Sequence, residues 1–150
     1  MLKKTLSLGF VLAAAAAFTA CGSDSSSNAG DDFDDTMSCN VKEDGNTLIY
    51  ESNTYGVILT QTYTFNDDGS YTLVYKQTYP DRMKATIGSA CDALKADFEA
   101  EDNGTNVDDI KCSDTTIEYK ASDNDSEMTL SDLKAGLQKQ CDIMNDAYGD

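Results

Sequence analysis

The strongest constraint on the fold is a predicted β-hairpin in the first half of the chain. Residues 56–65 and 70–79 alternate apolar and polar side chains, and the Asn-Asp-Asp-Gly sequence between them is typical of a hairpin turn. Strand periodicity places one set of side chains on a common face, namely Val57, Leu59, Tyr63, Phe65, Tyr71, Leu73, Tyr75 and Tyr79. The other face carries Thr60, Thr62, Thr64, Thr72, Lys76 and Thr78. We therefore expect a sheet with one packed face and one solvated face.

A second predicted hairpin precedes the first. Residues 39–43 and 47–52 are typical of strands, and an Asp-Gly pair favours a turn over residues 44–46. The apolar positions then change from even numbers in 47–52 to odd numbers in 57–65. Because such a change moves side chains to the other face, a turn or bulge must lie within 52–56, and we expect a turn.

The second half of the chain has helical periodicity. One predicted helix has an apolar stripe of Ile87, Cys91, Leu94 and Phe98, a capping box of Ser89 and Asp92, and an end at Asn103-Gly104. A later helix has a capping box of Thr129 and Asp132 and an apolar stripe of Leu130, Leu133, Leu137, Cys141, Met144 and Tyr148. Residues 115–121 alternate like a strand. The sequence thus predicts an α+β, two-layer domain of order ββββαβα, in which both helices pack on one face of an antiparallel meander sheet.

The start of the chain has the pattern of an export signal. Lys3 and Lys4 precede an apolar run over residues 6–18, which is too short to span a membrane as a stable helix. The sequence Phe18-Thr19-Ala20-Cys21 resembles the lipobox of bacterial lipoproteins, although Phe18 stands where that family usually has leucine. The resemblance implies a signal peptide over residues 1–20 and acylation of Cys21. The alternative is a plain secretory signal cut after Ala20.

The predicted domain boundaries follow from this signal. Residues 21–37 are rich in Ser, Gly, Asn and Asp, so we expect a lipidated, acidic and flexible tether. Residues 38–150 have the length of one globular domain. The expected location is the bacterial cell envelope, with the lipid in the outer membrane and the domain on its periplasmic face or at the cell surface.

The net charge limits the partners of the domain. Removal of residues 1–20 removes two lysines and no acid, which leaves nine basic and 27 acidic side chains and a net charge of −18. A body this negative is repelled by nucleic acid and by anionic headgroups, so we expect no nucleic-acid partner.

The cysteines agree with an oxidising compartment. Apart from Cys21, the chain has Cys39, Cys91, Cys112 and Cys141, an even number that predicts two disulfides. Elements that alternate in direction would pair Cys39 with Cys91 and Cys112 with Cys141, one of three possible connectivities. A metal site is the alternative, but the chain has no histidine and no close cysteine pair of the zinc type.

Catalytic and metal-binding candidates are few. Without histidine the most common general base is missing, so we expect no enzyme and no cofactor. A hydrolase based on two carboxylates remains an alternative. Asp123, Asp125 and Glu127 form a weak calcium candidate that resembles the start of an EF-hand loop, but Met128 and Lys134 replace the glycine and the closing glutamate that loop needs. The competing interpretation is a polar loop before a capped helix.

The tyrosines have two possible roles. Six of them would suit either a stacking platform or the core, namely Tyr50, Tyr55, Tyr63, Tyr71, Tyr75 and Tyr79. Strand phase favours the core for most of them, with Tyr55 and Tyr79 at strand ends as the expected exposed members.

The order of elements over residues 47–148 is similar to that of small YehR-like bacterial lipoproteins, a resemblance that carries no site residue. The expected function is that of a non-catalytic, lipid-anchored module that binds a protein or a glycan. The alternative is a structural or stress-related envelope module.

Overall fold

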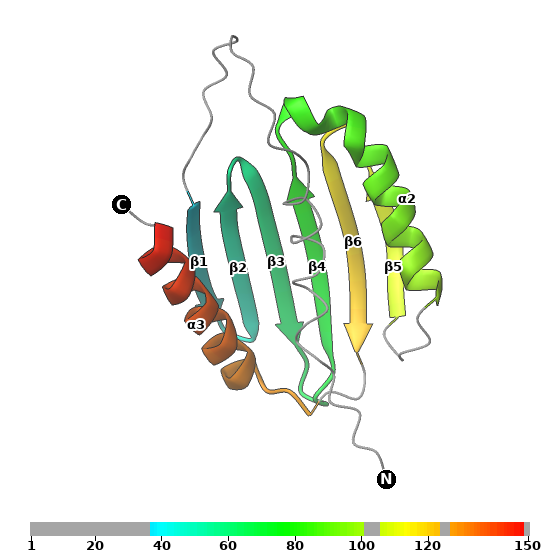
Figure 1. Cartoon of the computed structure of the whole chain (residues 1–150). Helices are drawn as coiled ribbons and strands as arrows, with labels where there is room; N and C mark the ends of the chain where they lie inside the picture. Colours follow the sequence, from blue (N-terminus) through cyan, green and yellow to red (C-terminus); the bar gives the residue numbers. More distant parts are fainter. Residues whose placement is uncertain (1–36, 101–105, 124–126, 149–150) are drawn as a thin grey trace. The chain divides into compact units, whose positions relative to one another are not determined.

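The computed structural model describes residues 37–100, 106–123 and 127–148, which belong to one compact unit over residues 33–150. Its centre is a six-stranded antiparallel sheet of order β1-β2-β3-β4-β6-β5 (Figure 1). The strands are β1 (Met37–Asp44), β2 (Thr47–Thr54), β3 (Val57–Phe65), β4 (Tyr71–Thr78), β5 (Asn106–Cys112) and β6 (Thr116–Asp123). The predicted α+β fold is confirmed.

Tight turns connect the first four strands. Tyr55 and Gly56 follow β2 with φ angles of 53° and 81°, as two-residue hairpin turns require. This turn confirms the expected change of strand phase. In the β3–β4 turn the Asp68 carboxylate accepts hydrogen bonds from the backbone N–H and the hydroxyl of Ser70 (2.9 and 2.6 Å), and these bonds lower the pKa of Asp68.

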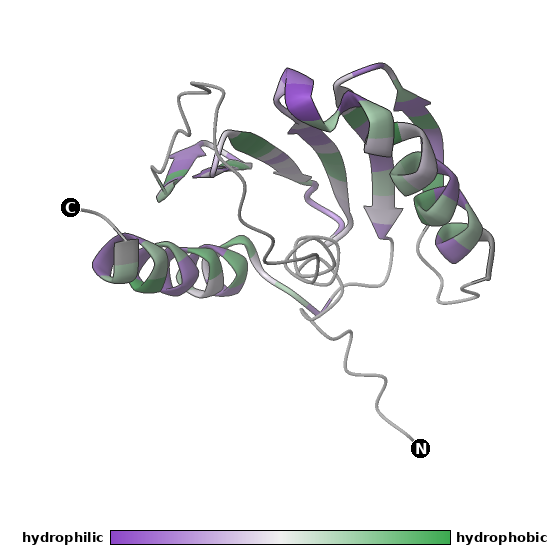
Figure 2. Ribbon diagram, turned by 45° about the horizontal axis from the view of Figure 1, so that its top comes forward, coloured by the Kyte–Doolittle hydropathy of each residue, from purple (hydrophilic) through white to green (hydrophobic). Residues whose placement is uncertain are grey.

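Two helices lie on the same side of the sheet (Figures 1 and 2). Helix α2 (Lys84–Ala100) packs near β5 and β6, and α3 (Leu130–Tyr148) packs over β1 and β2. The predicted cap of α3 is confirmed, because the Thr129 hydroxyl accepts a hydrogen bond from the Asp132 N–H (3.1 Å) and donates one to its carboxylate (2.7 Å). None of the helices in the described residues is long and apolar enough to cross a membrane.

The predicted cap of α2 is wrong. This helix begins at Lys84, after a 3₁₀ turn over Asp81–Met83 (η1), so Ser89 and Asp92 lie inside it. The sequence signal for this earlier start was Pro80 followed by Asp81, since proline and acidic side chains favour helix starts. The predicted end at Asn103-Gly104 lies outside the described residues.

The packed face is built from tyrosines. The buried core includes Tyr50, Tyr63, Tyr75, Tyr119 and Leu48 together with Leu133, Leu137 and Cys141 of α3. The rings of Tyr75 and Tyr119 stack with centroids 4.5 Å apart, and Phe98 of α2 meets Tyr119 edge-on at 5.2 Å. Two of the buried hydroxyls are paired within the sheet, because Tyr63 donates to the Gln61 side-chain oxygen (3.2 Å) and Tyr75 to that of Gln77 (2.6 Å).

Strand β5 is an element that the sequence analysis did not predict, and it changes the order of elements to ββββαββα. The residue Asp109 has a φ of 59°, and the register with β6 shifts between Asp108 and Lys111. The apolar residues on either side of this bulge, Val107 and Ile110, are three positions apart in the sequence. The alternation with a period of two that indicates a strand is therefore lost.

The predicted cysteine pairing is also wrong. Cys39 in β1 is bonded to Cys141 in α3, with Cα atoms 4.9 Å apart, and Cys91 in α2 is bonded to Cys112 in β5, with Cα atoms 6.4 Å apart. The prediction of Cys39 with Cys91 and Cys112 with Cys141 assumed a sheet without β5. Because β5 forms the sheet edge near α2, Cys112 lies beside Cys91, whereas Cys39 lies on the opposite edge below α3.

Candidate functional site

Neither α2 nor α3 packs on the second face of the sheet, and we call this face the open face (Figure 1). Strand register defines it, because Leu48, Tyr63 and Leu73 lie in one row on the packed face and the residues next to them point the other way. No helix or strand of residues 37–100, 106–123 and 127–148 packs on this face. Its side chains are Ser38, Asn40, Lys42, Asp44, Thr47, Ile49, Glu51, Asn53, Ile58, Thr60, Thr62, Thr64, Thr72, Val74, Lys76, Thr78, Asp108, Lys111, Thr116, Glu118, Lys120 and Ser122.

The open face is balanced in charge, although the chain is strongly acidic. Four lysines and four carboxylates lie on it, and Lys76 is directly opposite Glu118, which in turn is opposite Lys111. The excess of acidic over basic side chains in the sequence therefore comes from residues outside the open face. A partner without charge, or with both signs of charge, meets no net repulsion on this face.

A hollow of about 300 Å³ lies at the β1–β2–β3 end of the open face. Its lining residues are Ser38, Cys39, Asn40, Glu51, Ser52, Asn53 and Ile58. Five of the seven have open-face side chains by register, so the hollow opens on that side. Its volume is at the lower end of the range of small-molecule sites.

The hollow combines polar groups with an apolar surface. Asn40 and Glu51 are exposed neighbours on paired strands, and Ile58 is 48% exposed. Asn53 has a structural role as well, because its side-chain oxygen accepts a hydrogen bond from the Gly56 N–H (3.0 Å) in the β2–β3 turn. The sequence analysis missed these residues, although asparagines inside strands are a signal, since asparagine is depleted there.

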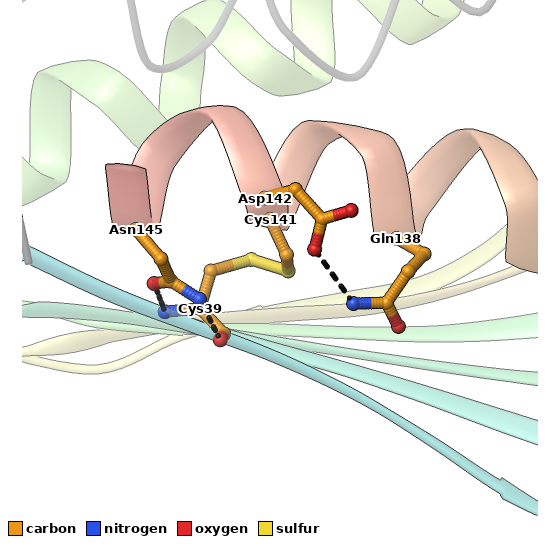
Figure 3. Close-up of a disulfide and its surroundings, with 5 residues drawn as sticks. All are labelled: Cys39, Gln138, Cys141, Asp142 and Asn145. Carbon is orange, nitrogen blue, oxygen red and sulfur yellow. Dashed lines mark hydrogen bonds between the residues drawn. A yellow bond between two sulfur atoms is a disulfide. The ribbon is translucent and has the colours of Figure 1, made fainter. Parts of the chain in front are cut away.

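The β1 edge of the sheet is capped by a side chain of α3 (Figure 3). The Cys39 N–H donates to the Asn145 side-chain oxygen (3.0 Å), and the Asn145 side-chain nitrogen donates to the Cys39 carbonyl (3.1 Å). The Asn145 amide thus forms hydrogen bonds with the N–H and C=O groups of Cys39 that point away from β2, as an added strand would do. Lys134 of α3 also pairs with Glu43 of β1 (2.6 Å).

The β5 edge is protected by its bulge. Lys111 pairs with Asp109 (2.6 Å), and the hydrogen bond and charge of Asp109 raise the pKa of Lys111. Bulges and edge charges disfavour the addition of a partner strand. The open face is therefore the better surface for a partner than either edge.

The predicted site residues are scattered. Cys21 and Asp125 lie outside the described residues. Asp123 is buried at the end of β6 and Glu127 is exposed, and the residues that the structure describes contain no group of three His, Cys, Asp or Glu side chains able to hold a metal ion. Because Asp125 is not described, the calcium candidate stays a prediction.

The two tyrosines expected at the surface differ. Tyr55 is 43% exposed in the β2–β3 turn, where its carbonyl accepts a hydrogen bond from the Arg82 guanidinium (2.7 Å). The expectation for Tyr79 is wrong, because it is only 5% exposed and packs with Ile87 and Ile117. Helix α2 begins close behind β4 and so covers the strand end that the sequence analysis left open.

Fold and site together define a two-layer α+β domain with one helix-covered and one open sheet face. The chain gives no match to protein-family models, to curated proteins or to solved structures.

Proposed function

We propose that this protein is a lipid-anchored lipoprotein of the bacterial outer membrane whose domain binds a protein or a glycan without catalysis. The observation that carries the proposal is the open face, a whole side of the sheet on which neither described α-helix packs and on which the charges are balanced, within an acidic chain. The lipobox-like sequence before Cys21 supports the anchor.

The chemistry of the hollow supports binding over hydrolysis. Glu51 is the one carboxylate in its lining, whereas glycoside hydrolysis uses two carboxyl groups about 5 to 10 Å apart. The lining also lacks a nucleophile paired with a base. A few hydrogen-bonding groups beside an apolar side chain are typical of a ligand-binding site.

The lipid anchor is tested by membrane partition of a Cys21→Ser variant. We expect the wild-type protein in the membrane pellet and the variant in the soluble fraction, because acyl chains supply the membrane affinity. A variant that still pellets with membranes would contradict the anchor.

The binding role is tested by photo-cross-linking in intact envelopes. A photoreactive residue replaces Lys76 on the open face or, as the control, Lys139 on the exposed side of α3. We expect a specific adduct from position 76 and none from position 139, and mass spectrometry distinguishes peptide from sugar adducts. Adducts from neither position would favour the structural module, and adducts from position 139 alone would place the partner on the helices.

A further inference from the structure

We propose that the hollow on the open face binds a neutral glycan. The inference rests on the proposed function, since it assigns a ligand class to the same face. The sugar chain would lie across β1, β2 and β3, with hydroxyl groups toward Asn40 and Glu51 and a ring face on Ile58.

The hydrogen-bonding groups of the hollow match hydroxyl groups. A sugar hydroxyl both donates and accepts, and the Asn40 side chain offers both functions. The Glu51 carboxylate accepts from two neighbouring hydroxyls, and such charge-assisted bonds are stronger than neutral ones. Asn40 and Glu51 are paired across β1 and β2 and both are exposed, so one sugar unit reaches both.

Apolar contact comes from the next strand. Ile58 in β3 pairs with Asn53 in β2 and is 48% exposed, so it presents an apolar surface beside the polar groups. An exposed isoleucine beside amides and a carboxylate suits a ligand with C–H faces and hydroxyl edges.

Charge disfavours ligands that carry a net charge. A net charge of −18 on the mature chain and Glu51 within the hollow repel sulfated or uronic-acid chains. The Asn40–Glu51 row continues to Lys76, opposite Glu118, so the face also offers no excess of acid for a cation. A neutral chain meets neither barrier.

A protein partner fits the hollow less well. Stable protein interfaces centre on buried aromatic or arginine anchors, and register places Ile58 as the one strongly exposed large hydrophobic side chain on the described open face. A peptide strand is disfavoured as well, because Asn145 occupies the outward backbone groups of Cys39 on the β1 edge beside the hollow.

The test is calorimetric titration of the full-length lipidated protein in detergent micelles. The probes are hexaoses of glucose, xylose and mannose, with hexagalacturonate as the anionic comparison. We expect saturable binding of at least one neutral hexaose and none of the anionic one. Glu51→Ala should weaken binding at least ~10-fold, since a hydrogen bond to a charged group is lost.

The matched control is Glu118→Ala, which removes the same charge from the same face on β6, away from the hollow. It should change affinity by less than about twofold, as expected for a site without contact to the ligand. Absence of binding by every neutral hexaose, or equal losses in the two variants, overturns the inference. If position 76 still cross-links to a peptide in that case, the binding role of the open face stands with a protein partner.

Discussion

At the scale of single residues, Asn145 joins the C-terminal helix to the first strand. Its side-chain amide makes both a donor and an acceptor contact with the backbone of Cys39. An edge strand with unpaired N–H and C=O groups invites pairing with another chain, and this amide satisfies one such position. Asparagine is the smallest side chain that offers both functions in a planar group.

We expect Asn145→Ala to lower the free energy of unfolding by about 1 to 3 kcal/mol, since each of two hydrogen bonds contributes about 0.5 to 1.5 kcal/mol. Urea unfolding measures the loss. The control is Gln138→Ala, which removes a hydrogen bond to Asp142 within α3 (3.0 Å) and should cost no more than about 0.5 kcal/mol. Equal losses in the two variants would mean that the contact of Asn145 with the edge strand stabilises the fold no more than a hydrogen bond within α3.

Hydrogen exchange separates the two halves of the contact. Asn145→Asp keeps an acceptor for the Cys39 N–H but loses the donor to the Cys39 carbonyl, so the Cys39 amide should stay protected in this variant and exchange rapidly in Asn145→Ala. Rapid exchange in the wild-type protein would contradict the contact.

At the scale of elements, each disulfide ties one helix to one edge of the sheet. The Cys39–Cys141 bridge has a sequence separation of 102 residues, whereas the Cys91–Cys112 bridge has a separation of 21. Because a longer closed loop restricts the unfolded chain more, the first bridge should stabilise the fold more.

We expect Cys39→Ser with Cys141→Ser to cost about 4 to 5 kcal/mol, and Cys91→Ser with Cys112→Ser about 3 kcal/mol, from the loop-length dependence of chain entropy. Urea unfolding of the two double variants measures both values. A larger loss from the short bridge would show that strain or packing, rather than loop length, determines their contributions.

How far the sequence predicts the elements depends on local regularity. The β3–β4 hairpin and the Thr129 cap were predictable because period, turn and cap signals agree there. Strand β5 was not predictable, because the left-handed backbone conformation of Asp109 interrupts its alternating pattern. Without β5 in the predicted sheet, the cysteines could not be paired correctly. Tyr79 was misjudged because only tertiary packing brings α2 over the end of β4. The hollow spans three strands, so no single segment of the sequence marks it.

At the scale of the whole molecule, the tyrosine core sets an alkaline limit to stability. Burial raises the pKa of Tyr63, Tyr71, Tyr75, Tyr79 and Tyr119 above the ordinary value of 10.0. The folded state therefore keeps protons that the unfolded state releases above that value. It follows that this contribution to stability is fully present below about pH 10 and is lost as the pH rises further.

We expect a titration followed by phenolate absorbance to show delayed ionisation of the buried tyrosines, together with loss of the far-ultraviolet circular dichroism signal. The coincidence of the two transitions reports unfolding that is coupled to ionisation. Complete ionisation near pH 10 with an intact circular dichroism signal would contradict the buried placement of these hydroxyls.

The position of the Cys39–Cys141 bridge bears on mechanical behaviour in the proposed anchored state. A pull on the lipid enters the domain at Met37, the first residue of an edge strand that would otherwise peel from its neighbour one hydrogen bond at a time. The covalent bond at Cys39 halts that unzipping near its start and passes the tension to the last helix of the chain. A domain anchored in this way would therefore resist unfolding when a force acts between the membrane and a partner bound to the domain.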